Sequence, residues 1–361
     1  MLLALLLATA GLATLWLRAR TNAGIDFYQM WIGPRMARES TAFYAPATRA
    51  RMGEIYLQEA EEQGASPRQI AVARYRRDLE VLSTPFLYTV YAALQLDYER
   101  SFLLFHIIVF AAFVGWVAIF ARLLSYGALP TLLVLGFLTT IAEPLRSDAT
   151  VGNMNHIMIA LLAIAALATV RRAYAVAGAI LAIATLLKPY VILTIPVVYV
   201  FWIAARRWRD LARHAAGAAV AGTIALVGSS LYFRSPSIWL DWLDAFRAMP
   251  SSMIPLDVGN FALAAISRPL SVAVFIAALI ATIFAASRRH ADPVLPIALG
   301  CVLFQFVSPL VWVHHLLLSV PLILWLLRPG ADRRIQIAGA VALALIAVEP
   351  WGTYVPTVRE V

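Results

Sequence analysis

The residue whose type and position most clearly suggest chemistry is Asp26, the single carboxylate in the segment 24–31. It follows an apolar run and is surrounded by aromatic residues. An acid at the edge of a membrane bundle is costly to desolvate, and such groups commonly have a function. We therefore interpret Asp26 as a candidate catalytic base of a membrane enzyme. The alternative is structural, because Asp is a common N-cap residue and Asp26 could cap a helix at the membrane edge.

The composition places the chain among α-helical membrane proteins. Of its 361 residues, 62% are hydrophobic and 14% are charged, and the mean hydropathy is +0.79. A soluble protein would carry about a quarter charged residues. Apolar runs long enough to cross a bilayer recur throughout, without the alternation of a β-barrel. We expect an all-α polytopic membrane protein with one transmembrane domain over residues 1–361.

The apolar runs predict about eleven transmembrane spans. The first covers residues 2–17, which lack the basic start and the cleavage site of a signal peptide. The other expected spans are 101–121, 129–144, 154–170, 173–187, 189–204, 214–233, 269–287, 293–308, 312–328 and 335–349. Two long polar loops, 19–82 and 234–268, lie between spans. In the first loop, residues 48–80 have the pattern of an interfacial amphipathic helix, broken at 64–67.

The basic residues of the short loops orient these spans. If the loop 19–82 is extracytoplasmic, the short outer turns carry Arg146 and Lys188. The short inner loops then carry Arg122, Arg171, Arg172, Arg206, Arg207, Arg209, Arg213, Arg288, Arg289, Arg328, Arg333 and Arg334. This distribution follows the positive-inside rule and predicts a multi-pass protein of the plasma (inner) membrane. It also explains the net charge of +9 better than nucleic-acid binding does.

The polar motifs that a membrane bundle does not need all fall on the outer side of this topology. They are Asp26, the segment 83–85, Arg146 to Asp148, the segment 152–156, Lys188 with Pro189, the segment 259–268 and the segment 308–315. The inner side carries arginines but no comparable mixture of Asn, His, Asp and Lys. The asymmetry predicts a reaction or binding site at the extracytoplasmic mouth of the bundle.

Structural explanations exist for each motif taken singly. Lys188 could reach toward lipid head groups, and Asn153 and Asn155 could bond neighbouring helices. His314 and His315 point about 100° apart on a helix, so at most one of them faces a given cavity centrally. Adjacent histidines also disfavour a metal site, because ligands on one helix are three or four residues apart.

The order of the motifs resembles glycosyltransferase family 87, the polyprenyl-phosphate-mannose-dependent α-mannosyltransferases with the GT-C membrane fold. The matching motifs are an acid in the first outer loop, a Pro-bearing turn, Gly-x-x-Asn at 152–155, Lys-Pro at 188–189, Gly-Asn with a following Arg at 259–268, and Ser-Pro-x-x-Trp-x-His-His at 308–315. The last motif is the most specific. The chain departs from the family at Asn153, where Gln is usual, and at 83–85, where Tyr-Pro-Pro is usual.

The resemblance implies transfer of a hexose, mannose in the family, from a polyprenyl phosphate to a lipid or glycan acceptor. Asp26 would take the acceptor proton, and a single displacement would invert the anomeric configuration. Cations would stabilise the leaving phosphate, and the candidates are Lys188, Arg268, His314, His315 and Arg146. Candidates for binding the sugar or acceptor are Tyr28, Asn153, Asn155, His156, Asn260 and Trp312. No cofactor and no nucleic-acid partner are implied, and the sequence shows no carboxylate cluster suited to a hard metal ion.

Two other classes of protein remain open from the sequence. A lipid or sugar transporter, such as a flippase, would also place polar residues at the membrane mouth beside Pro-broken spans. The lack of an internal repeat and the one-sided motifs count against it. A non-catalytic membrane assembly subunit is the third hypothesis, and in such a protein Asp26 would be replaceable.

Overall fold

The computed structural model describes residues 1–361 except 41, 250–259, 290–291 and 348–361. In this part of the chain the structure consists of helices and connecting turns. The α-helices are α1 (Leu2–Thr21), α2 (Ile25–Glu39), α3 (Pro46–Glu62), α4 (Pro67–Tyr75), α5 (Pro85–Tyr91), α6 (Tyr98–Leu123), α7 (Ala128–Ile141), α8 (Glu143–Val151), α9 (Asn155–Val170), α10 (Tyr174–Leu187), α11 (Thr194–Ala204), α12 (Trp208–Tyr232), α13 (Ile238–Arg247), α14 (Leu263–Ile266), α15 (Arg268–Arg289), α16 (Leu295–Val307), α17 (Val320–Leu327) and α18 (Arg333–Ala347). Short 3₁₀ helices are η1 (Ala92–Leu94), η2 (Pro189–Val191) and η5 (Val313–Ser319).

Four of the described helices are long and apolar enough to cross a membrane: α1, α6, α12 and α15. The pair α7 and α8 passes the same test together and is bent by 62°, as in a broken span or a re-entrant loop. Shorter apolar helices, among them α9, α10 and α16, pack between the longer ones. The chain is therefore a polytopic membrane protein, while the count of eleven spans and the GT-C fold stay predictions.

The helices agree well with the intervals expected from hydropathy. Each expected span contains a helix, although the last two residues of 335–349 lie outside the described part of the chain. The break expected at 64–67 separates α3 from α4, where Ser66 caps α4 by accepting a hydrogen bond from Gln69 N. The apolar runs and the Pro and Gly signals thus predicted the positions of these helices, but not that of α2.

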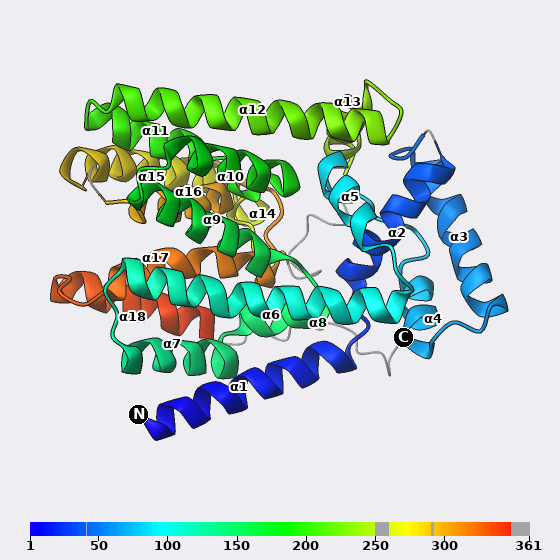
Figure 1. Ribbon diagram of the computed structural model, residues 1–361, viewed down its shortest axis with the longest axis horizontal. Helices are drawn as coiled ribbons and strands as arrows, with labels where there is room; N and C mark the ends of the chain where they lie inside the picture. Colours follow the sequence, from blue (N-terminus) through cyan, green and yellow to red (C-terminus); the bar gives the residue numbers. More distant parts are fainter. Residues whose placement is uncertain (41, 250–259, 290–291, 348–361) are drawn as a thin grey trace.

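The polar first loop forms a helical cap at one end of the bundle. Figure 1 shows α2, α3, α4 and α5 gathered at the end reached by the carboxyl end of α1, with α13 nearby. Hydrogen bonds fasten the cap: Tyr98 Oη donates to Ala23 O at 2.7 Å, and Trp242 Nε1 of α13 donates to Leu82 O at 3.0 Å. Buried aromatic rings, including Phe27, join α2 to α6 below this cap.

Candidate active site

Asn153 is the centre of a polar cluster between the cap and the bundle. Its side-chain Nδ2 donates to Asp26 Oδ2 at 2.7 Å and lies 3.2 Å from His314 Nε2. Its Oδ1 accepts from Lys188 Nζ and from Met154 N, both at 2.7 Å. Two donors on the oxygen set the amide orientation, so the nitrogen faces the carboxylate and the imidazole. Four segments distant in the chain therefore meet at one amide.

Two glycines allow the carboxylate to approach this amide. Gly24 precedes α2 with φ +70°, and Gly152 ends α8 with φ +70°, a left-handed conformation that side chains disfavour. A Cβ on Gly152 would lie 3.0 Å from Cβ of Phe27 and 3.3 Å from Cα of Gly24. The start of α2 thus packs directly on the turn that carries Asn153.

Asp26 is the second residue of α2 and lies in the first turn of this helix. The N-cap residue is Gly24 and no side-chain cap bond is present, so the structural alternative of an Asp26 N-cap is wrong. Negative charge still suits this position because the helix dipole is positive there. The side chain is 22% exposed, so the carboxylate is open to a ligand as well as to its protein partners.

Arg76, which follows α4, is a partner of Asp26 that the sequence did not reveal. Its NH2 lies 3.4 Å from Asp26 Oδ1, and its NH1 binds Glu80 Oε2 at 2.5 Å. The guanidinium side chain is 13% exposed. Nothing in an arginine-rich amphipathic segment singles out this residue, so only the folded cap identifies it as a neighbour of the carboxylate.

Lys188 lies in the turn between α10 and η2 and is buried. Besides its bond to Asn153, its Nζ is 5.4 Å from the centre of the Tyr190 ring, a cation–π distance. Burial lowers the pKa of Lys188, while the nearby carboxylates of Asp26 and Asp148 act in the opposite direction. The ammonium is thus a buried group that binds the same Asn153 amide as the candidate base.

The two adjacent histidines differ in their surroundings, as expected from their angular separation. His314 Nε2 lies 4.0 Å from Asp26 Oδ2 and 3.2 Å from the Asn153 amide. His315 packs on Tyr190 with ring centres 4.3 Å apart, and its Nδ1 accepts from Trp312 N at 3.3 Å. His314 is therefore the histidine that faces Asp26, and His315 holds the start of η5.

Asp148 and Asn155 connect the helices that carry the cluster around Asn153. Asn155 Nδ2 donates to Asp148 Oδ1 at 2.8 Å and to His314 O at 3.0 Å, which ties α8 and α9 to η5. Both residues are fully buried. The sequence singled out Asp148 only as a neighbour of Arg146, but the Asp148 carboxylate is fully buried whereas the Arg146 side chain is partly exposed.

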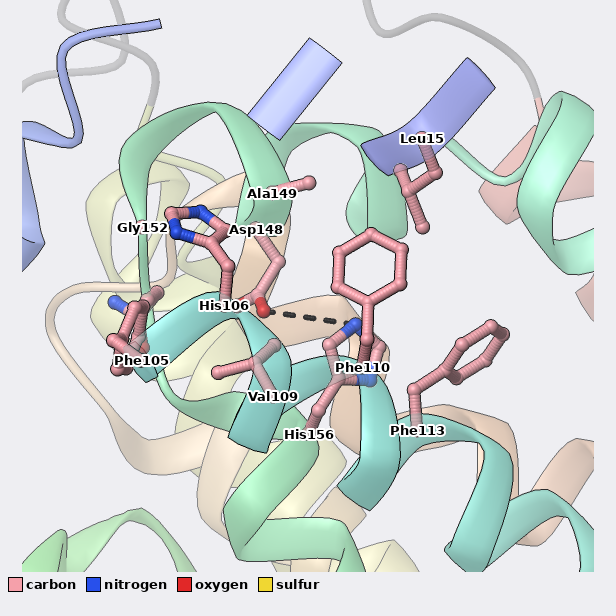
Figure 2. Close-up of a pocket in the computed structure, with 11 residues that line it drawn as sticks. Leu15, Phe105, His106, Val109, Phe110, Phe113, Asp148, Ala149, Gly152 and His156 are labelled. Atoms are coloured by element: carbon pink, nitrogen blue, oxygen red, sulfur yellow. Dashed lines mark ion pairs between the residues drawn. The ribbon is translucent and has the colours of Figure 1, made fainter. Parts of the chain in front are cut away.

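A small cavity lies beside these supporting residues. Its volume is about 10 Å³, enough for one water molecule, and it is lined by α6, α8 and α9 with Leu15 of α1. Figure 2 shows Asp148 directed toward His156, with Oδ2 3.7 Å from Nε2. His156 Nδ1 accepts from Trp116 Nε1 at 3.2 Å. His156 thus contacts Asp148 and Trp116, and among the described residues no hydrogen bond or ion pair joins it to Asp26.

Asn260 and Trp312 form a second contact between the long second loop and the motif 308–315. Asn260 Nδ2 donates to Pro309 O at 2.9 Å, and its Oδ1 accepts from Val311 N at 2.9 Å. An isolated antiparallel bridge pairs Asn260 with Trp312. Asn260 therefore positions the segment that leads into His314. Gly259, its partner in the sequence motif, lies outside the described residues.

Three predicted site residues have other neighbours. Tyr28 is buried against Trp31 and Tyr98, with ring centres 6.1 and 6.0 Å away. Arg146 pairs with Glu143 at 3.1 Å, one helical turn earlier. Arg268 is exposed at the start of α15. Among the described residues, no hydrogen bond or ion pair joins these three to the cluster around Asn153. The geometry therefore favours Lys188 as the cation of the cluster, with the His314 imidazole beside it.

No metal site is evident in the described ranges 1–40, 42–249, 260–289 and 292–347, where no three His, Cys, Asp or Glu side chains converge. Fold and site together define a polytopic membrane protein with a polar, partly exposed cluster beneath a helical cap. A family model for glycosyltransferase family 87 matches residues 82–348, and the chain belongs to that family. It is thus a membrane glycosyltransferase. The match includes Asn153, Lys188 and His314 but begins after Asp26.

No curated protein and no solved structure shows a significant match to the chain. The roles of individual residues are therefore argued below from the geometry and from the family alone.

Proposed function

We propose that the protein transfers a hexose, mannose by family resemblance, from a polyprenyl phosphate to a lipid or glycan acceptor at the extracytoplasmic side of the membrane. The observation that carries the proposal is the convergence of Asp26, Lys188 and His314 on the Asn153 amide. A partly exposed carboxylate beside two buried nitrogen bases suits a reaction in which a hydroxyl attacks and a phosphate leaves.

Asp26 is the proposed general base. As the acceptor oxygen bonds to the anomeric carbon, the hydroxyl proton passes to the carboxylate and the bond from that carbon to the phosphate oxygen breaks. The phosphate leaves with the electron pair and needs no protonation. Asn153 holds the carboxylate through Oδ2, at 2.7 Å. A single displacement of this kind inverts the anomeric configuration.

Lys188 and His314 are the proposed partners of the leaving phosphate. Both are buried, and charge-assisted bonds to phosphate are strong in such surroundings. The Lys188 ammonium has three donors, of which Asn153 takes one, so others are free for phosphate oxygens. Arg76 is the second cation of this region, after Lys188, and balances Asp26 while the acceptor is absent.

The proposal is tested by incubating the purified full-length protein with polyprenyl-phosphate mannose and a membrane lipid extract. Mass spectrometry of the extracted lipids should reveal a product heavier by one hexose, formed in proportion to time and enzyme. Absence of such a product, with donor and acceptor both present in detergent and in vesicles, would contradict the proposed donor. A parallel incubation with the other polyprenyl-phosphate hexoses identifies the sugar.

A further inference from the structure

A larger pocket lies far from the Asn153 cluster. It has a volume of about 360 Å³ and is formed where α9 ends, α10 and α12 begin and α16 begins. Asn155 starts α9 at the active-site cluster, and Val170 ends it at this pocket. Sixteen residues of helix span about 24 Å, so the pocket and the cluster lie at opposite ends of α9.

Arg207 forms one wall of the pocket and is held rigidly. Its Nε donates to Asp210 Oδ2 at 2.9 Å and its NH2 to Tyr174 Oη at 2.7 Å. The guanidinium lies 5.3 Å from the Tyr174 ring centre and 5.4 Å from that of Trp202. NH1 of this guanidinium has no partner in these contacts, so it can donate to a ligand while Nε and NH2 stay engaged.

Arg172 adds a second guanidinium to the same lining, in the turn that connects α9 to α10. Its backbone is in the left-handed region, with φ 60°, which directs the chain sharply from one helix into the next. The one carboxylate of the lining, Asp292, is already engaged: Oδ1 accepts from Val294 N and Leu295 N, and Oδ2 from Trp325 Nε1. The charged groups of the lining that remain available to a ligand are therefore the two guanidinium groups.

His214 supplies a buried donor. Its side chain is fully buried, and Nδ1 lies 3.3 Å from the Tyr199 hydroxyl. Nε2 has no hydrogen-bond partner in the described structure although it is inaccessible to bulk solvent. If Nδ1 accepts from the Tyr199 hydroxyl, Nε2 carries the proton and can donate to an anion. A buried polar atom of this kind is costly unless it has a partner.

Apart from Thr169, whose hydroxyl donates to Ala165 O, the remaining lining is apolar and includes Leu181, Val198 and Ile297. A site that combines cationic donors with aliphatic side chains matches an anionic amphiphile. We propose that this pocket binds the phosphate of an anionic membrane phospholipid, with Arg172, Arg207 and His214 as donors and the aliphatic wall against the glycerol and first chain carbons. Basic pockets between membrane helices are typical sites for such head groups.

The distribution of arginines favours a lipid over a soluble phosphate ester as the ligand. Arg171, Arg172, Arg206 and Arg207 lie together at the end of the bundle opposite the cap, where the positive-inside rule expects the cytoplasmic leaflet. Anionic lipids concentrate at such arginine-rich surfaces. The bound lipid would fix the ends of α9 and α10, whose other ends carry Asn153 and Lys188 in adjoining turns.

The test uses the full-length protein in vesicles of phosphatidylcholine and phosphatidylglycerol, followed by native mass spectrometry of the released protein. Wild type should retain one phosphatidylglycerol. Arg172→Gln and Arg207→Gln should each retain at least about tenfold less, as loss of a charge-assisted phosphate bond predicts. Arg206→Gln is the matched control, because Arg206 is exposed in the same turn as Arg207 and does not line the pocket.

Equal retention in wild type and both pocket variants would overturn the proposal, as would an equal loss in Arg206→Gln. Displacement of the lipid by millimolar glycerol phosphate would reassign the pocket to a soluble phosphate ester. Arg207→Gln could unfold because Asp210 and Tyr174 lose a partner. Arg172→Gln then decides, because the Arg172 side chain makes no hydrogen bond or ion pair with the described residues that would support the fold. All of these outcomes are measured as lipid retention, so none of them depends on whether the protein transfers a sugar.

Discussion

The Asn153 amide donates a hydrogen bond to Asp26 Oδ2 over 2.7 Å, although 127 positions separate the two residues. The same amide accepts from Lys188 and approaches His314. One neutral side chain thus joins a carboxylate, an ammonium and an imidazole without adding charge. In the proposed reaction it keeps the base directed toward the acceptor while the two nitrogen groups face the donor phosphate.

Replacing Asn153 should therefore disable transfer more than it disturbs folding. Asn153→Ala removes the bonds to Asp26 and Lys188 together, and we expect the rate of transfer to fall about 10²-fold, as for loss of one preorganised donor. The measurement is hexose transfer at saturating donor. Asn22→Ala, at the same end of the bundle and bonded to Arg18 O, should keep normal turnover. Near-normal activity of Asn153→Ala would remove this residue from the mechanism.

The approach of α2 to the α8 turn can be tested by adding one methyl group. Gly152→Ala places a Cβ 3.0 Å from Phe27 in addition to straining a φ of +70°. Gly64→Ala meets a similar φ of +61° with no atom within 4 Å. We expect Gly64→Ala to cost about 1 kcal/mol and Gly152→Ala clearly more. Thermal unfolding in detergent measures both; equal losses would show that the contact with Phe27 is easily relieved.

Asp148 should act through the bond it accepts from Asn155. Asp148→Asn keeps an oxygen for Asn155 Nδ2, whereas Asp148→Leu leaves that buried donor with one partner fewer. We expect the Leu variant to be about 1–3 kcal/mol less stable than the Asn variant. Transfer should follow the same order, because Asn155 also holds His314 O. A Leu variant as stable as the Asn variant would contradict this role.

Binding of the donor should depend on pH through Lys188. Burial lowers the pKa of Lys188, so its positive charge is lost at a lower pH than that of an exposed lysine. Affinity for a polyprenyl phosphate should therefore weaken as the pH rises through the alkaline range. Lys188→Arg keeps its charge there and should bind with little pH dependence. If the affinity of wild type and of Lys188→Arg fell equally at alkaline pH, the group that titrates would not be Lys188.

Much of the cluster could be predicted because topology restricts where loops can meet. Asp26, Asn153, Lys188 and His314 lie in different segments, yet hydropathy and the arginine distribution placed them on one side of the membrane. Residues in the loops at one end of a narrow helix bundle necessarily lie close to one another. The structure adds the atoms that touch and distinguishes His314 from His315.

The remaining features depend on packing that a linear pattern does not contain. Tyr28 follows Asp26 by two positions, so on one helix the two side chains point about 200° apart. That conclusion required knowing that α2 is a helix, which the aromatic segment did not indicate. Arg76 is one of several arginines in its loop, and the position of α4 alone brings it to Asp26.

The most direct test of the central claim is the rate of hexose transfer by Asp26→Asn, measured with polyprenyl-phosphate mannose alongside wild type, with donor binding measured on the same samples. Asparagine can still accept from Asn153 but cannot take the acceptor proton. We predict that transfer is abolished while expression and donor binding remain close to wild type. Turnover near the wild-type rate would contradict the assignment of Asp26 as the catalytic base.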